Sequence, residues 1–167
     1  MKRIMFVCHG NICRSPMAEY IMKHLLTVLN LENGYTVASS ATSTEELGSP
    51  VYPPAQRELY RHGISCGRRE ATQLSSEDYG RYDLFVLMDD RNMRNILRIF
   101  KSDPEGKICK LMSFLGSSRD VSDPWYSGDF SRAYDDIFEG CVALISALEP
   151  RFTREYILRA FSSAGKQ

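Results

Sequence analysis

A cysteine and an arginine with five residues between them lie near the start of the chain, in the segment Val7–Pro16, which reads VCHGNICRSP. Helix N-termini and nearby cations favour the thiolate form of a cysteine, and the thiolate is the nucleophile. The planar guanidinium of arginine can bind two oxygens of one phosphoryl group. We therefore expect Cys8 to attack phosphorus and Arg14 to hold the phosphoryl oxygens.

The surroundings of this segment predict a strand, a tight loop and a helix start. An apolar run, Ile4–Val7, precedes the loop, and a helical pattern follows it. Backbone N–H groups of such a loop and of the first helical turn bind phosphate-sized anions. The expected phosphate-binding residues are consecutive: His9, Gly10, Asn11, Ile12, Cys13, Arg14 and Ser15.

Individual residues of the loop suit this conformation. Gly10 lets the backbone turn where a side chain would clash, and Asn11 tolerates the left-handed region. Ser15 is a plausible N-cap, with Pro16 at the first helical position. The Ser15 hydroxyl is equally suited to stabilising the Cys8 thiolate, and both uses remain open.

The segment VCHGNICRSP resembles the phosphate-binding loop of the low-molecular-weight protein tyrosine phosphatases. Several phosphatase folds share the spacing of cysteine and arginine, but its place near the N-terminus and the run GNICRSP are specific to this family. The alternative, a buried structural cysteine, leaves Gly10 and Arg14 without a purpose. The resemblance covers about Lys2 to Leu148.

A second motif, DPWY, spans Asp123–Tyr126. Asp-Pro alone usually marks a turn, but together with the Cys8 loop it resembles the family's general-acid motif. The resemblance implies that Asp123 protonates the leaving group and later accepts a proton from water. Trp125 and Tyr126 would wall the cleft and stack on an aryl ring, with ordinary packing as the alternative.

The resemblance also suggests supporting contacts. Ser39 matches a family serine that hydrogen-bonds the loop asparagine, here Asn11. Two departures put the rigidity of the loop in doubt: Ala38 stands where relatives often have an acidic residue, and the region around Arg69, GRREAT, lacks the bracing histidine.

Other residues are assigned to the cleft or to redox chemistry. His9 and Glu45 are expected at the rim of the substrate cleft, although this rim could equally be a solvated surface. In relatives with a cysteine at the place of Cys13, a reversible disulfide protects the nucleophile, so Cys13 is the predicted redox partner of Cys8. An inert buried thiol is the alternative for Cys13.

Strands and helices alternate along the chain. The expected strands cover residues 2–7, 35–38, 82–88 and 107–112. The expected helices cover residues 17–29, 54–62, 75–79, 90–100 and 130–148. This alternation predicts an α/β, single-domain, three-layer, flavodoxin-like fold with a four-stranded parallel sheet of order 2-1-3-4. Long loops at 39–54 and 113–129 would then lie at the carboxyl edge of the sheet, beside Cys8.

The composition is that of an ordinary globular protein of 167 residues, with 21 acidic and 21 basic residues. We expect one phosphatase domain over residues 1–149 and a C-terminal extension over 150–167 with one or two helical turns. No basic tract, signal peptide or membrane-length apolar run is present, which argues against nucleic acid and membrane partners. A monomer is favoured.

The five cysteines and three histidines show no disulfide framework and no metal-ligand spacing. We therefore expect no metal, no cofactor and a reducing cytoplasmic location. The predicted function is metal-independent hydrolysis of phosphotyrosine in proteins, or of small aryl phosphates, through a cysteinyl-phosphate.

Two alternatives are weaker. A thioredoxin-coupled arsenate reductase needs two further cysteines after the third strand, where this chain reads VLMDDRNMRN. A non-catalytic phosphotyrosine-binding module has no need of Cys8, Arg14 and Asp123 together.

Overall fold

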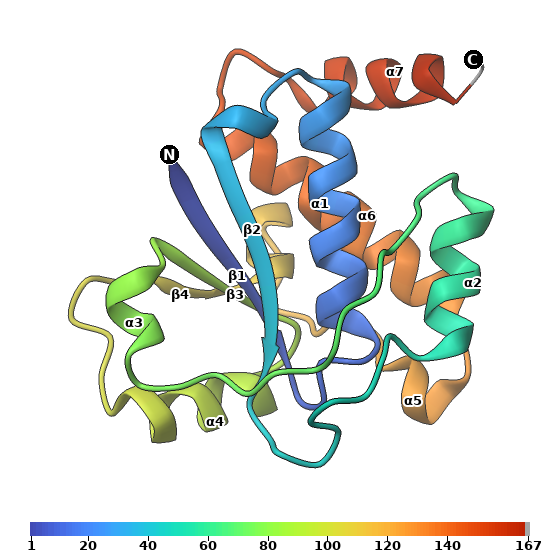
Figure 1. Ribbon diagram of the computed structural model, residues 1–167. Coiled ribbons are helices and arrows are strands. Elements are labelled where there is room, and N and C mark those ends of the chain that lie inside the picture. The colour runs from blue at the N-terminus through green and yellow to red at the C-terminus, as the bar shows by residue number, and fades with distance from the viewer. Residues whose placement is uncertain (166–167) are drawn as a thin grey trace.

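Four short segments form the strands of one parallel sheet, in the order β2-β1-β3-β4. The strands are β1 (Lys2–Cys8), β2 (Tyr35–Ala41), β3 (Leu84–Leu87) and β4 (Ile108–Lys110). The structure, a computed structural model, describes residues 1–165, and helices cover both faces of the sheet (Figure 1). The predicted single-domain α/β fold and its strand order are confirmed.

Alternate residues of β1 face the two helical layers. Ile4 and Phe6 belong to a large buried cluster with helices α1 (Arg14–Val28) and α6 (Phe130–Leu148). Met5 and Val7 pack on the other face, in a smaller cluster with residues of β3 and with Ile96 of α4 (Asp90–Phe100). Since both faces of β1 are buried, its carboxyl end is held rigidly, and Cys8 is its last residue.

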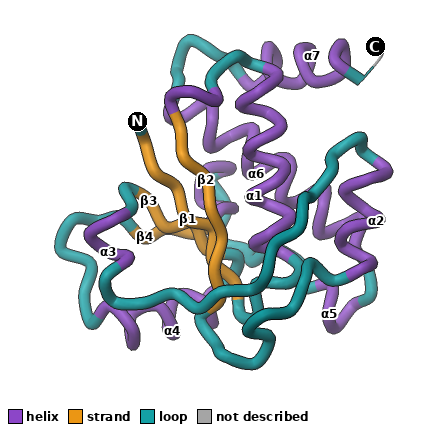
Figure 2. The backbone as a smooth tube through the Cα atoms, in the orientation of Figure 1, coloured by secondary structure: helices purple, strands orange, loops and turns teal. Residues whose placement is uncertain are grey.

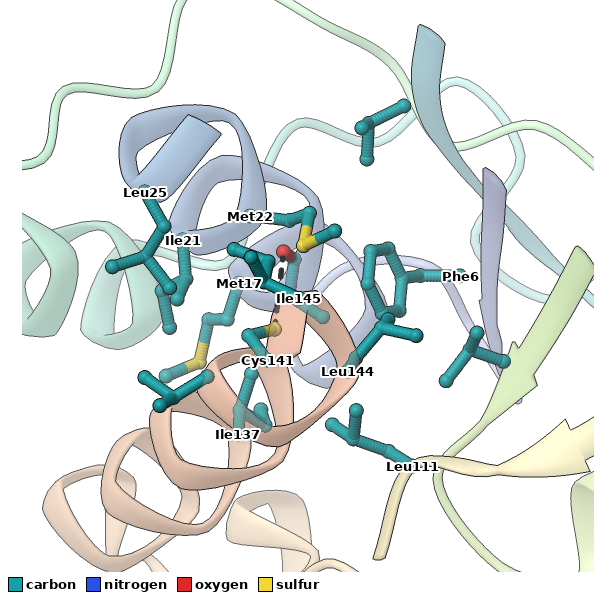
Figure 3. Packing of buried hydrophobic residues seen from close by; sticks show 14 of the residues in the cluster. Phe6, Met17, Ile21, Met22, Leu25, Leu111, Ile137, Cys141, Leu144 and Ile145 are labelled. Atoms are coloured by element: carbon teal, nitrogen blue, oxygen red, sulfur yellow. Dashed lines mark hydrogen bonds between the residues drawn. The ribbon is translucent and has the colours of Figure 1, made fainter. Parts of the chain in front are cut away.

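The interface between α1 and α6 forms the centre of the larger cluster (Figure 3). Phe6 of β1 lies against side chains of both helices, and Cys141 of α6 lies among them. The Cys141 thiol is fully buried and donates to the carbonyl of Ala18 over 3.9 Å. Burial raises the pKa of this thiol, so Cys141 is a packing residue of the core.

One of the two uses left open for Ser15 is not found, and one predicted strand boundary is wrong. Helix α1 begins at Arg14 with Cys13 as its N-cap residue, so Ser15 lies inside the first turn and caps nothing. Strand β2 continues to Ala41, so Ser39 lies within the strand and not at its end. The strand is longer because residues 39–41 continue to pair with residues 6–8 of β1, and Ala41 also donates its N–H to the Thr72 carbonyl at 2.7 Å.

The remaining elements frame the site or extend the fold. They are η1 (Glu32–Gly34), α2 (Pro53–Arg61), α3 (Asp78–Arg81), the 3-10 helix η2 (Leu111–Leu115) and α5 (Pro124–Ser127). The region 113–129, expected as a loop, therefore contains the end of η2 and a short helix. Figure 2 shows that the loops after β1 and β2 gather at one edge of the sheet.

The C-terminal extension forms a helix, α7 (Arg154–Ala164), which is longer than the one or two turns expected. Its Ile157 is fully buried, and Phe161 packs on Phe138 of α6 with ring centroids 4.8 Å apart. The last two residues of the predicted extension, 166 and 167, lie outside the described residues. Within residues 1–165, no helix combines the length and apolarity that crossing a membrane requires.

Candidate active site

A cleft of about 210 Å³ opens at the carboxyl edge of the sheet, where the loops after β1, β2, β3 and η2 meet. Its lining residues are Cys8, His9, Gly10, Ile12, Cys13, Arg14, Glu45, Glu46, Asp89, Arg91, Asp123, Trp125 and Tyr126. The two predicted motifs therefore meet in one cleft. Of the residues expected to bind phosphate, Asn11 and Ser15 have fully buried side chains that do not line the cleft.

The sulfur of Cys8, a residue only 4% exposed, lines this cleft among hydrogen-bonding groups. The Oγ atom of Ser15 is 3.0 Å from Sγ, and the backbone N–H of Asn11 donates to Sγ over 3.3 Å. Both groups can donate to a negatively charged sulfur and so stabilise a thiolate. Of the two uses that the sequence left open for Ser15, the contact with Cys8 is the one found.

The guanidinium of Arg14 is buried and points toward the cleft between two carboxylates. Its Nη2 donates to Asp89 over 2.7 Å and to Asp123 over 3.1 Å, while Nη1 donates to the Val121 carbonyl over 3.1 Å. Burial alone would lower the pKa of Arg14, but the negative charges of Cys8, Asp123 and Asp89 raise it above its ordinary value. Arg14 is therefore a fixed positive charge.

Asp89, which the sequence analysis did not assign to the site, caps α4, where its side chain accepts the N–H of Asn92 at 2.7 Å. The same carboxylate also binds Arg14. Since the cap fixes the orientation of Asp89, the start of α4 orients the guanidinium in the cleft. No local signal distinguishes this cap from any other aspartate at a helix start.

Asp123 is the N-cap of α5, and its Oδ1 accepts the N–H of Trp125 at 3.1 Å. Its Oδ2 contacts Arg14, so the cap holds the carboxylate toward the phosphate loop. Trp125 and Tyr126 are 54% and 77% exposed, which places both rings on the surface of the cleft. Tyr52, which sequence reasoning missed, packs on Trp125 with centroids 5.2 Å apart.

Behind the loop, a buried polar network supports its conformation. Asn11 adopts φ 57°, in the left-handed region, and donates from its amide to Ser15 at 2.8 Å and to Ser39 at 3.0 Å. The hydroxyl of Ser39 donates to Glu19 at 2.5 Å. The side chain of Asn11 thus substitutes for backbone partners and stabilises a backbone conformation that few residues adopt.

Arg69 completes this network from a distant part of the chain. Its guanidinium donates to the Asn11 carbonyl over 2.7 Å, to the Asn11 side-chain oxygen, and to Ser39 over 3.2 Å. Arg69 thus stands where the resemblance led us to look for a histidine. We call Asn11, Ser15, Ser39, Arg69 and Glu19 the loop support; sequence reasoning missed the roles of Arg69 and Glu19.

The rim of the cleft beside the loop after β2 is acidic. The Nε2 of His9 lies 2.9 Å from a carboxylate oxygen of Glu45, and Glu46 accepts a hydrogen bond from Ser49 at 2.9 Å. His9 and Glu45 therefore lie together at the mouth of the cleft. Arg91, from the first turn of α4, adds a positive charge to the lining.

Fold and cleft define a parallel α/β protein with a cysteine and an arginine in the loop after β1, at the carboxyl edge of its sheet. The family profile described as low molecular weight phosphotyrosine protein phosphatase matches residues 3–154. The chain belongs to this family, whose members are hydrolases.

Individual relatives agree with this assignment. The human low molecular weight phosphotyrosine protein phosphatase is 36% identical over 147 residues, which cover 84% of this chain and 89% of the human protein. The crystal structure of YfkJ from Bacillus subtilis matches with a TM-score of 0.86 at 32% identity, covering 92% of this chain and 98% of YfkJ. A structure described as a Drosophila arginine phosphatase matches with a TM-score of 0.79 at 29% identity, covering 89% of this chain and 98% of that protein.

Proposed function

We propose that this chain hydrolyses phosphotyrosine in proteins, and small aryl phosphates, without a metal and through a phosphate ester of the Cys8 thiolate. The observation that carries the proposal is the meeting of Cys8, Arg14 and Asp123 in one cleft with exposed aromatic rings. A nucleophile, a bidentate cation and a carboxyl group are the three parts that this chemistry needs.

In the first step, the Cys8 thiolate attacks phosphorus as the bond from phosphorus to the phenolic oxygen breaks. Protonated Asp123 gives its proton to the departing oxygen, and the products are the free phenol and cysteinyl-phosphate. Arg14 and the backbone N–H groups of the loop stabilise the equatorial oxygens, whose charge develops in the transition state. Arg14 and these N–H groups would supply the positive charge that the transition state needs, so the proposed step uses no metal ion.

In the second step, water attacks phosphorus and the bond from sulfur to phosphorus breaks. The carboxylate of Asp123 accepts a proton from the water, and the Cys8 thiolate is released with inorganic phosphate. The contacts of Ser15 and Asn11 with Sγ support this step, because they stabilise the negative charge on the departing sulfur.

Aromatic side chains favour an aryl phosphate as the substrate. Trp125 and Tyr126 line the cleft and are free to stack on a phenyl ring, with Tyr52 packed behind Trp125. Cys8 is only 4% exposed, so a long phosphotyrosine side chain reaches it more readily than phosphoserine does. A phosphoprotein with phosphotyrosine is therefore the proposed partner.

We also propose the redox role of Cys13 and a reducing cytoplasmic setting. Peroxide would oxidise the Cys8 thiolate to a sulfenic acid, and the Cys13 thiol would condense with it, releasing water and forming a disulfide that an added thiol reduces. Burial, and then the charge of Cys8, raise the pKa of Cys13 to about 12, so it is a thiol at neutral pH. Equal recovery of Cys13→Ala and the parent after peroxide and thiol would contradict this role.

The decisive assay compares the parent with Cys8→Ser and Asp123→Ala in the presence of a chelator. The substrates are a phosphotyrosine peptide, an activated aryl phosphate and a phosphoarginine peptide, the last because one structural neighbour is described as an arginine phosphatase. We expect rapid turnover of both aryl phosphates by the parent and none by Cys8→Ser. Faster hydrolysis of phosphoarginine, or a need for metal, would overturn the proposal.

A further inference from the structure

A groove rich in arginine lies beside the cleft, outside the catalytic residues. Two adjoining hollows of about 680 and 490 Å³ share Gln56 and Cys66, and are lined by residues of α2 and of the segments that precede and follow it. Four arginines and one glutamate line them, although the whole chain has equal numbers of basic and acidic residues. We call this surface the basic groove; its arginines are Arg57, Arg61, Arg68 and Arg69.

Two of these arginines have their donors open to a ligand. Arg57 and Arg68 are exposed, and neither forms an ion pair or a side-chain hydrogen bond with any described residue of the chain. Arg61 binds the buried Glu58 over 2.9 Å, and Arg69 belongs to the loop support. The groove thus combines two arginines that are held by other residues of the chain, Arg61 and Arg69, with two whose guanidinium groups can bind carboxylates, Arg57 and Arg68.

The basic groove and the cleft share a wall. Glu46 lines the cleft, whereas Gly48, two residues further on, lines the groove and donates its N–H to the Ala71 carbonyl at 3.0 Å. Arg69 lines the groove and also binds Asn11 of the phosphate loop. A substrate chain that leaves the cleft across residues 46–48 would therefore reach the groove.

We propose that the basic groove binds an acidic segment of the phosphoprotein substrate, close in its sequence to the phosphotyrosine. This inference rests on the proposed function and names the class of substrate. Arginine forks match carboxylates in geometry and charge, and Tyr60, which is 78% exposed, offers an aromatic surface beside them. With two exposed ion pairs of this kind, we expect kcat/KM at low salt to be about threefold to tenfold higher for a substrate with the acidic segment than for one without it. Added salt should reduce this difference, because it screens the ion pairs.

The test uses phosphotyrosine peptides that differ only in a tail, either of glutamates or of glutamines, placed before or after the phosphotyrosine. The parent is compared with the double variant Arg57→Glu, Arg68→Glu. A matched control, Arg94→Glu with Arg98→Glu, makes the same charge change on exposed positions of α4. A small aryl phosphate reports whether each variant keeps its catalytic site.

We expect the parent to prefer the glutamate tail in one of the two placements, and the control variant to keep this preference. The groove variant should lose the preference while it retains its activity on the small aryl phosphate. Equal kcat/KM for both tails in both placements would overturn the proposal. Loss of the preference in the control as well would also overturn it, since overall charge would then be the cause.

A binding measurement separates this inference from the proposed function. The glutamate tail without phosphotyrosine is titrated into the labelled parent, and amide NMR shifts are followed. We expect shifts concentrated in residues 56–70. Such shifts without any phosphotyrosine hydrolysis would overturn the catalytic proposal alone, whereas their absence would overturn the groove. Larger shifts with an oligothymidylate of equal charge would assign the groove to nucleic acid and overturn a protein segment as its ligand.

Discussion

Two arginines hold the phosphate loop, and they do so in different ways. Arg14 lines the cleft and is held by the carboxylates of Asp89 and Asp123. Arg69 lies outside the cleft and binds neutral oxygens of Asn11 and Ser39. We infer that the loop has a chemical face, where Arg14 would bind the phosphoryl group of the substrate, and a structural face, where Arg69 holds the backbone. Changes on the two faces should therefore differ in kind as well as in size.

The largest effect is expected for Arg14→Lys. An ammonium group keeps the charge but cannot bind two phosphoryl oxygens at once, so kcat should fall about 10²- to 10³-fold. Steady-state kinetics with an aryl phosphate measure this, and thermal unfolding checks that the fold survives. A loss below about tenfold would show that the positive charge alone suffices, and would contradict the proposed bidentate contact of the guanidinium with the phosphoryl oxygens.

The next effect concerns Asp123→Asn. Asparagine is also a good N-cap, so α5 should persist while the acid is lost. We expect kcat to fall about 10²-fold for phosphotyrosine and clearly less for a nitrophenyl phosphate, whose phenolate leaves without a proton. Equal losses on both leaving groups would mean that Asp123 acts by holding Arg14, and not as the acid.

A smaller loss of rate with a larger loss of stability is expected for Arg69→Met. The variant leaves buried oxygens of Asn11 without their donors, which should cost about 1–3 kcal/mol in the free energy of unfolding. Denaturant unfolding measures this, and kcat should fall about tenfold as the loop loses rigidity. Arg69→Lys is the control and should recover part of both. If Arg69→Met lowers kcat as much as Arg14→Lys does, the separation of the two faces is wrong.

The smallest effect concerns the support of the acid loop. Asp136 accepts two hydrogen bonds from Arg119, at 2.7 and 3.0 Å, and one from the N–H of Ser122. Burial would raise the pKa of Asp136, but these contacts outweigh it and hold the pKa below its ordinary value of 3.8. The stability that they supply is therefore present above pH 3.8 and is lost as the pH falls through the lower, folded-state pKa.

Arg119→Ala tests this dependence. At pH 7 we expect a decrease of about 1 kcal/mol in the free energy of unfolding. Denaturant unfolding at several pH values should show the difference from the parent shrinking below pH 3.8, where Asp136 becomes protonated. A difference that stays constant down to the acid limit would mean that Arg119 acts through packing and not through its charge.

The residues of the chemical face could be predicted from the sequence, whereas most residues of the structural face could not. Cys8 and Arg14 belong to one contiguous motif, and Asp123 begins another, because the chemistry demands these side-chain types at short, fixed spacings. The apolar run of β1 predicted a buried strand, and the alternation of strands and helices along the chain predicted the strand order. The sheet then brings the two motifs to the same edge.

The contact of Arg69 with the phosphate loop could not be predicted, because its partner Asn11 lies 58 residues away in the sequence. The residues around Arg69 give no local sign that this side chain, rather than another long polar one, makes the contact. The role of Asp89 toward Arg14 was hidden by its equally valid role as a helix cap. For Ser15 the sequence left two uses open, because a serine at a helix start is also typical of an N-cap; the structure shows the contact with the Cys8 sulfur, seven residues away.

The most direct test of the account is to trap the covalent intermediate. Asp123→Asn is mixed with an activated aryl phosphate, because the substrate needs no acid in the first step while the second step lacks its base. Acid quenching within one turnover, digestion and mass spectrometry should find one phosphoryl group on the peptide that contains Cys8, and none in a Cys8→Ser sample. A burst of phenol with an unmodified Cys8, or with phosphate on another residue such as His9, would contradict the central claim.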